Sequence, residues 1–282
     1  MLYSPSMDIG FAHYPKTAGH SLTNWFREAF PDAYLVEPHP LYQVNHLPVR
    51  ESLERLGLVQ RPVDRLGKPL RGLSRACARL TRRVAGWLPA GRTAKAVDGA
   101  ACGTRIIGVV REPFDMLVSL FEYWRCYDFT QAPTQPLIVS ARTGNFREFL
   151  RMAVVDRVLV NYQDFFDVHG PARSTTRLLD FHSLEPALMQ VCREFGVDMP
   201  SSKLKLLNAG PQRQRDLSRY RLEAGPLLSA VRSHFRWYYE EGTNVMVKGT
   251  AAPVASHPSV HSHRWCPPWS DNRFLALAGG HS

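Results

Sequence analysis

Apolar and polar residues near the start of the chain change from a strand-like to a helix-like pattern. The segment from Asp8 to His13 is mostly apolar and is marked by the turn residues Gly10 and Pro15, which predicts a short β-strand. Apolar residues then recur at helical spacing until Pro31 stops the pattern, namely Leu22, Trp25, Phe26 and Ala29. The sequence therefore predicts a strand, a tight loop and a helix.

Two further segments repeat the order of strand and helix. Ile106 to Val110 is an apolar, β-branched run typical of a buried parallel strand, and Pro113 suits the first turn of a following helix. The buried face of that helix is expected to hold Phe114, Leu117, Val118, Phe121 and Trp124, with Ser119 interrupting it. The stretch RLLDFHSLEPALMQVCREFGVDMP predicts another strand and helix, with Ser183 as the cap, Pro186 in the first turn and Gly196 at the end. This alternation predicts an α/β domain around a central parallel sheet, and a chain of 282 residues with 44% hydrophobic content can fill its core.

The loop before the first helix has the residue types of an anion site. Unpaired N–H groups and the helix dipole attract a negative charge there, and Lys16 adds a full positive charge. Thr17 and Ser21 offer hydroxyl groups, and Gly19 allows a close approach of the backbone. An ordinary turn with a solvated lysine is the alternative. An ATP-binding P-loop is disfavoured, because the chain lacks the G-K-[ST] ending of that motif.

A second anion site is expected at the next predicted strand. Arg111 lies at its carboxyl end, where open α/β sheets bind ligands, and Ser119 follows about two helical turns later. Each residue also has a structural interpretation: Arg111 as the ion-pair partner of Asp115, and Ser119 as a small core residue. His13 is expected to be structural.

The two segments resemble the nucleotide motifs of the sulfotransferases. YPKTAGHSL is similar to their 5′-phosphosulfate loop, and VVREPFDMLVSLFEYWR to their 3′-phosphate motif, R-x-P-x-x-x-x-x-S. The resemblance is to carbohydrate-type and related bacterial members, and it implies a three-layer sandwich of P-loop nucleotide-kinase-like plan. It also implies binding of 3′-phosphoadenosine-5′-phosphosulfate (PAPS), with PAP as the product and no metal. The residues assigned to the 5′ end are Lys16, Thr17, Ala18, Gly19, His20, Ser21 and Leu22, and those assigned to the 3′-phosphate are Arg111 and Ser119. His20 replaces the threonine of many members, so one hydroxyl donor is missing.

The same resemblance suggests further site residues. LLNAGPQRQRDLSRY is similar to a later loop that closes over the nucleotide, in which Arg213 or Arg215 would reach a phosphate, unless this is a solvated basic run. Lys16 is the expected electrostatic catalyst. His46, in NHLPVRESLERLG, is the favoured general base and His39 the second choice, while a plain structural histidine, Glu28 or Glu37 remain alternatives.

Positive charge is concentrated in one part of the chain. Between Arg61 and Arg105 there are eleven Lys or Arg and two acidic residues, against a formal net charge of +10 for the whole chain. Residues 70–88 predict an amphipathic basic helix, which suits an anionic membrane surface, an acidic acceptor, a lid or an ordinary surface position. Nucleic acid is not an expected partner, because no recognised motif accompanies the charge.

The remaining features concern organisation and location. No signal-peptide pattern and no long apolar stretch is present, so we expect a cytoplasmic protein, with peripheral membrane contact through residues 70–88 as an alternative. Five scattered cysteines favour neither disulfides nor a zinc site. We expect one domain over residues 1–248, with a basic insert at about 59–105, and a tail rich in Pro, Ser and His over residues 249–282.

The expected activity is transfer of the sulfuryl group from PAPS to a hydroxyl, with an amine as the less favoured acceptor. The acceptor would be a carbohydrate, a lipid or a small molecule. A nucleotide-dependent kinase is one alternative, for which Asp180 is the candidate magnesium-binding carboxylate. The other is a non-catalytic nucleotide-binding protein that contacts a membrane or partner through its basic helix.

Overall fold

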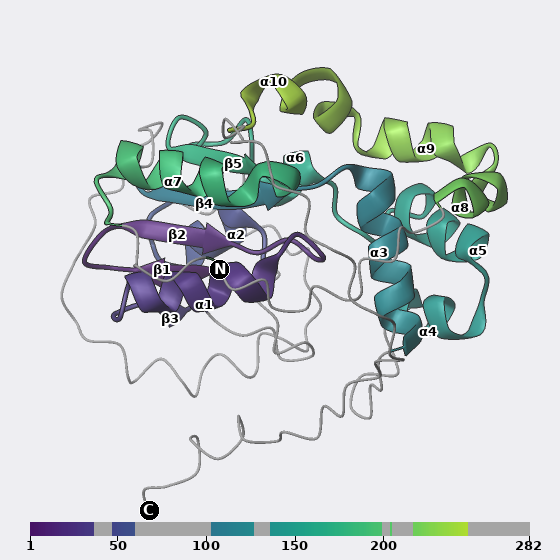
Figure 1. The fold of residues 1–282 in the computed structure, drawn as a ribbon, viewed down its shortest axis with the longest axis horizontal. Helices are drawn as coiled ribbons and strands as arrows, with labels where there is room; N and C mark the ends of the chain where they lie inside the picture. The colour runs from purple at the N-terminus through teal and green to yellow at the C-terminus, as the bar shows by residue number, and fades with distance from the viewer. Residues whose placement is uncertain (37–46, 60–102, 127–135, 199–203, 205–216, 248–282) are drawn as a thin grey trace, which may run out of the picture.

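The computed structural model describes residues 1–36, 47–59, 103–126, 136–198, 204 and 217–247 (Figure 1). Several residues and segments singled out in the sequence lie outside this part of the chain: His39, His46, Arg213, Arg215, the basic segment 70–88 and the tail 249–282. Their expected roles therefore stay predictions.

A mixed sheet of five strands lies at the centre of the fold, in the order β3-β1-β2-β4-β5. The strands are β1 (Leu2–Ser4), β2 (Ile9–Ala12), β3 (Tyr34–Leu35), β4 (Arg105–Val110) and β5 (Thr176–Asp180). β2, β4 and β5 are parallel, as the sequence predicts, with Phe11 opposite Ile107 and Val109 opposite Leu179. β1 is antiparallel to both β2 and β3, so the sheet is not purely parallel. The short connection between β1 and β2 leaves room only for a hairpin, which requires antiparallel pairing.

Helices of moderate length connect the strands. They are α1 (Gly19–Ala29), α2 (Val49–Arg55), α3 (Pro113–Cys126), α4 (Pro136–Thr143), α5 (Phe146–Leu150), α6 (Tyr162–Phe166), α7 (Leu184–Phe195), α8 (Leu217–Ala224), α9 (Leu227–His234) and α10 (Thr243–Val245). Two π-helical segments, Arg151–Val155 and Tyr238–Gly242, and a 3₁₀ turn, Phe181–Ser183, complete the described elements. The predicted strand-helix pairs are confirmed as β2 with α1, β4 with α3, and β5 with α7.

Helices cover both faces of the sheet. On one face, Ile107 and Val109 of β4 pack in a cluster with residues of α1 and α7, such as Phe26 and Leu188. On the other face, Ile106 and Val110 join a larger cluster with residues of α3, α6 and α9. Because alternate residues of a strand point to opposite faces, the unbroken apolar run of β4 fits a strand that is buried on both sides.

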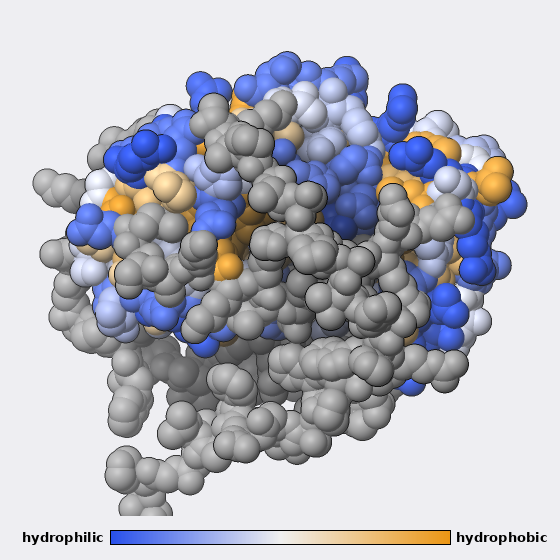
Figure 2. All heavy atoms as spheres, in the orientation of Figure 1, coloured by the Kyte–Doolittle hydropathy of each residue, from blue (hydrophilic) through white to orange (hydrophobic). Residues whose placement is uncertain are grey.

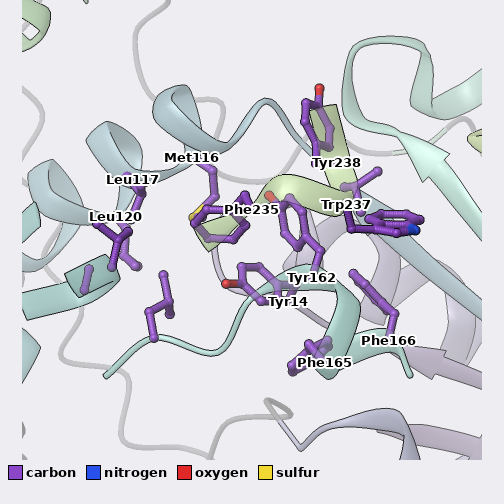
Figure 3. Packing of buried hydrophobic residues seen from close by; sticks show 14 of the residues in the cluster. Tyr14, Met116, Leu117, Leu120, Tyr162, Phe165, Phe166, Phe235, Trp237 and Tyr238 are labelled. Atoms are coloured by element: carbon purple, nitrogen blue, oxygen red, sulfur yellow. The ribbon is translucent and has the colours of Figure 1, made fainter. Parts of the chain in front are cut away.

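Aromatic side chains fill the larger cluster near the carboxyl ends of the strands (Figure 3). The Tyr14 ring meets those of Tyr162 and Phe165 edge to face, with centroids 4.7 and 4.9 Å apart. The Tyr14 hydroxyl donates to the carbonyl of Val160, which satisfies it inside the core. Burial raises the pKa of Tyr14 and of Tyr162 well above the usual value, so both phenols stay protonated at neutral pH. These contacts fix the chain immediately before the loop that follows β2.

The start of α7 differs from the prediction. Ser183 precedes the helix, but its buried hydroxyl finds no partner and does not cap the first turn. Asp180 instead accepts a hydrogen bond from the backbone N–H of His182, at 3.2 Å, because a 3₁₀ turn separates β5 from α7. The predicted end is confirmed, since Gly196 adopts a left-handed conformation with φ of 65°.

None of the helices in the described part of the chain is both long and apolar enough to cross a membrane. The surface in the orientation of Figure 1 is mostly hydrophilic over the region between α7 and α9 (Figure 2).

Candidate functional site

The loop between β2 and α1 ends in an uncapped helix N-terminus. Lys16 and Ala18 both adopt left-handed backbone conformations, with φ of 60° and 62°. Ala18 occupies the cap position and has no side chain to bind the N–H groups of the first turn. A serine or aspartate usually satisfies one of these groups. The uncapped turn and its helix dipole therefore suit an external anion.

Gly19 has a packing role in addition to the one expected. A Cβ at this position would lie 1.5 Å from Nε2 of His13, which is far inside contact distance. The His13 ring is buried and stacks on Phe11, with centroids 6.1 Å apart. Gly19 is thus required by the packing of the expected structural histidine, whether or not a ligand approaches the backbone.

The hydroxyl groups of the loop face inward. Thr17 is buried, and its Oγ1 donates to the carbonyl of Tyr14 at 2.8 Å. Ser21 is also buried, on the first turn of α1. Leu22 packs in the cluster between α1 and the sheet, so only its backbone lies at the loop. In this structure the Thr17 proton is used to close the loop, in contrast to its expected role as a donor to the ligand.

Lys16 extends from the loop towards α3. Its ammonium lies over the ring of Tyr123, with Nζ 4.0 Å from the ring centroid. Such a cation-π contact holds a lysine in place while preserving its charge. Sequence reasoning missed Tyr123, although its position one turn after Ser119 places the two on neighbouring parts of one helix face.

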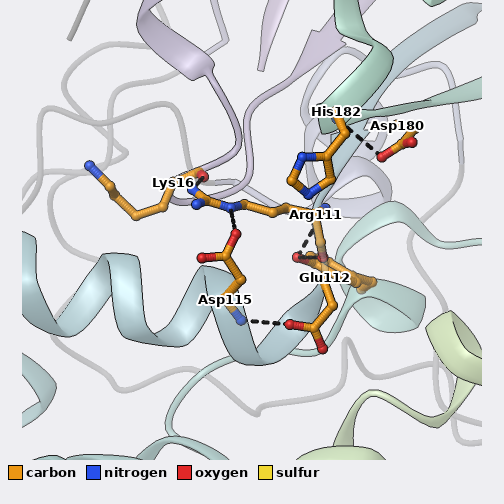
Figure 4. Close-up of polar contacts among 7 residues, drawn as sticks. Lys16, Arg111, Glu112, Asp115, Asp180 and His182 are labelled. Atoms are coloured by element: carbon orange, nitrogen blue, oxygen red, sulfur yellow. Dashed lines mark hydrogen bonds and ion pairs between the residues drawn. The ribbon is translucent and has the colours of Figure 1, made fainter. Parts of the chain in front are cut away.

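Arg111 joins the two predicted anion sites (Figure 4). One guanidinium nitrogen, Nη1, donates to the carbonyl of Lys16 at 3.3 Å, and Nε donates to Asp115 Oδ2 at 2.7 Å. The guanidinium also lies 4.4 Å from the centroid of the Phe181 ring. Its side chain is only 12% exposed, so its position is well defined by these contacts. The expected ion pair with Asp115 is present, and phosphate binding by Arg111 remains a prediction.

Two tyrosines bind the segment at Arg111 and Glu112, one through the backbone and one through a side chain. The Tyr162 hydroxyl donates to the Arg111 carbonyl at 2.8 Å. Glu112 accepts the N–H of Asp115 and the hydroxyl of Tyr239, both at 2.7 Å, and so caps the first turn of α3. Burial and the Glu112 charge raise the pKa of Tyr239, which keeps this hydroxyl a donor. Ser119 lies further along α3 and is buried, which agrees with the alternative interpretation of this serine as a small core residue.

His20 lies on the first turn of α1 with an exposed side chain. Desolvation by neighbouring groups and the charge of Lys16 both lower the pKa of His20 below its usual 6.5. The ring is therefore neutral at pH 7, and Lys16 and Arg111 supply the positive charge, offset in part by Asp115.

No group of three or more His, Cys, Asp or Glu suited to a metal ion occurs among the described residues. The arrangement can hold an anion through two cations and a helix N-terminus.

No family model and no curated protein matches the chain. A solved structure that is similar is the mouse sulfotransferase SULT7A1 complexed with PAP, at 17% sequence identity and a TM-score of 0.35. The match covers 89% of this chain and 73% of the mouse chain. A likeness at this level does not define a family, so the functional conclusion depends on the site itself.

Proposed function

We propose that the protein is a sulfotransferase that uses PAPS as the sulfuryl donor. One observation carries this proposal: the hydrogen bond from Arg111 to the Lys16 carbonyl brings the two motifs that resemble sulfotransferase sequences into one site. The motifs lie 95 residues apart in the sequence, so their meeting is a property of the fold. The full fold would be the three-layer plan of the P-loop nucleotide kinases.

The proposed donor lies along the start of α1 and one face of α3. Its 5′-phosphosulfate would take the N–H groups of the loop and Lys16, and its 3′-phosphate would take Arg111 and Ser119. Arg213 or Arg215 is the proposed additional phosphate ligand. A phosphate of the donor would compete with Asp115 for Arg111, since both are anions and the guanidinium is already paired.

Sulfuryl transfer depends mainly on position and charge, as phosphoryl transfer does. The bond between sulfur and the bridging phosphate oxygen breaks, and sulfur forms a new bond to the acceptor oxygen. Lys16 would stabilise the negative charge that develops on the bridging oxygen. The acceptor hydroxyl would give its proton to a base, for which His46 is proposed first and His39 second. The acceptor would be a carbohydrate, lipid or small molecule, and residues 70–88 are proposed to contact an anionic membrane.

Calorimetric titration with 3′,5′-ADP, without metal, tests the donor site. We expect saturable binding that weakens about tenfold or more in Lys16→Met and in Arg111→Lys, because each variant loses a charge or a forked hydrogen-bond donor. Arg27→Ala is the matched control, since this exposed residue lies in the last turn of α1, away from the loop. The Arg27 variant should bind like the wild type.

Two results would contradict the proposal. Tight binding of ATP with magnesium, without binding of 3′,5′-ADP, would favour the kinase alternative. Binding of 3′,5′-ADP without release of PAP from PAPS in the presence of a panel of hydroxyl acceptors would favour a non-catalytic nucleotide-binding protein.

A further inference from the structure

A pocket of about 550 Å³ lies where the first turn of α3 meets α8, α9 and the π-helical segment Tyr238–Gly242. Its lining includes Glu112, Phe114, Arg221, Ser229, Arg232 and Tyr239. Neither Lys16 nor Arg111 lines it, and Figure 4 shows the Glu112 side chain turned away from Lys16. The volume falls in the range of small-molecule sites. The proposed sulfuryl donor therefore leaves this pocket unexplained.

Two arginines give the pocket its positive charge. Arg221 lies 5.9 Å from the centroid of the Phe114 ring, and Arg232 lies 5.8 Å from that of Tyr239. Both side chains are exposed, and neither forms an ion pair with another residue of the described chain. Each guanidinium group thus lies beside an aromatic ring that also lines the pocket, and its hydrogen-bond donors are not used in an ion pair.

The acidic residue of the pocket forms no ion pair with the arginines, although its charge offsets part of theirs. Both oxygens of Glu112 are already hydrogen-bonded, one to the N–H of Asp115 and the other to the hydroxyl of Tyr239. The Ser229 hydroxyl donates to the carbonyl of Pro226 at 2.7 Å, so it is not an additional donor for a ligand. Two guanidinium groups and one carboxylate leave a net charge of about +1, which a monoanion balances.

The rest of the lining is apolar. Phe114, Leu228, Val231 and the ring of Tyr239 contribute hydrocarbon surface beside the charged groups. A ligand that uses the whole pocket therefore needs a flat apolar body as well as a charged head group.

From this lining, we propose that the pocket binds a small amphiphilic monoanion, a sulfate monoester or carboxylate on a flat apolar body. The head group pairs with Arg221 and Arg232, and the body packs against Phe114 and Tyr239. The site is independent of PAPS and would exist even if the proposed sulfotransfer activity were absent.

Calorimetric titration of the full chain with 4-nitrophenyl sulfate and with 4-nitrobenzoate tests this site. At least one of the two should bind saturably at one site per chain, and the stronger one identifies the preferred head group. 4-Nitrophenol and inorganic sulfate, each lacking half of the ligand, should bind at least about tenfold more weakly. 4-Nitrophenyl phosphate, a dianion at pH 8, should also bind more weakly than the sulfate.

Two arginine variants localise the binding. Arg221→Gln and Arg232→Gln should each reduce affinity about tenfold, because each loses a charge-assisted hydrogen bond. Arg219→Gln is the matched control, as this exposed arginine of α8 does not line the pocket. Because these arginines are exposed, we expect the variants to fold like the wild type. A thermal melt of each variant checks that it is folded.

The proposal is overturned if neither probe binds saturably at millimolar concentration, or if both arginine variants bind as tightly as Arg219→Gln. A probe that loses affinity in Lys16→Met, and not in the arginine variants, binds at the loop after β2 and also overturns it. None of these outcomes depends on 3′,5′-ADP, so failure here is distinguishable from failure of the proposed function.

Discussion

Gly19 shows how a single residue can belong to the packing of a site and to its chemistry at once. The glycine lies at the proposed 5′-phosphosulfate loop, yet the atom that excludes a side chain is Nε2 of His13. A substitution at Gly19 would therefore affect stability first, and any loss of ligand binding would follow from movement of the loop.

A double-mutant cycle separates these effects. Gly19→Ala should lower the free energy of unfolding by about 1–3 kcal/mol, because the new methyl group overlaps the His13 ring. In the His13→Ala background the same change should cost less, giving a coupling energy of about 0.5–3 kcal/mol. Urea denaturation of the four proteins measures both quantities.

Gly103→Ala is the control for this cycle, because an added Cβ there meets nothing within 4 Å. It should leave stability close to that of the wild type. Equal costs of Gly19→Ala with and without the histidine ring would show that His13 is not what requires the glycine.

At the scale of elements, α3 connects the two proposed phosphate sites. Its first turn is capped by Glu112 and carries the Asp115 partner of Arg111, and its third turn places Tyr123 under Lys16. Both proposed phosphate sites thus depend on the position of one helix, which packs through Phe121 against Phe146 with ring centroids 5.3 Å apart.

Replacement of Tyr123 tests whether α3 positions the lysine. Tyr123→Leu should reduce kcat for sulfotransfer about three- to thirtyfold, matching the roughly 0.5–2 kcal/mol of a cation-π contact, with a smaller effect on KM for PAPS. Tyr123→Phe keeps the ring and should retain most of the activity. Steady-state kinetics with PAPS and an accepted hydroxyl substrate measure both.

Tyr34→Leu provides the comparison for Tyr123. This tyrosine is 46% exposed on the edge strand β3, so its loss should not affect kcat. A Tyr123→Phe variant as slow as Tyr123→Leu would contradict the cation-π role and point to the hydroxyl instead.

The sequence predicted some elements and contacts of the site and missed others for physical reasons. Strand β4 and helix α3 carry strong apolar or periodic signals, whereas β2 is short and its signal is weaker; the Lys16 and Arg111 motifs lie directly after the two strands. The strands Leu2–Ser4 and Tyr34–Leu35 are too short to have a periodicity of their own. The contacts of Tyr123 with Lys16 and of His13 with Gly19 arise from how segments pack in space. The helical spacing of Ser119 and Tyr123 shows that they share a helix face, but not that Lys16 lies over that face.

For the whole molecule, the buried tyrosines make stability sensitive to alkaline pH. The folded-state pKa values of Tyr14 and Tyr162 lie above the usual 10.0, so the unfolded chain releases these protons first. Their contribution to stability is fully present below pH 10 and is lost as the pH rises through and above that value.

Urea denaturation between pH 8 and about pH 11.5 tests this dependence. The free energy of unfolding should fall above pH 10 by up to about 1.4 kcal/mol per pH unit for each of the two tyrosines. Tyr14→Phe should remove about one proton from this slope and cost about 0.5–1.5 kcal/mol at neutral pH, because the Val160 carbonyl loses its partner. A slope unchanged by Tyr14→Phe would contradict the assignment.

The hydrogen bond between Arg111 and the Lys16 carbonyl also bears on how the anion site forms during folding. The two residues are far apart along the chain, and the parallel pairing of β2 with β4 places the segments that carry them side by side. The loop motif is complete within the first 36 residues, but a peptide of that length would lack the arginine that orients it. The anion site is therefore complete only once this long-range contact has closed, and we expect its appearance during refolding to report that the parallel sheet has formed.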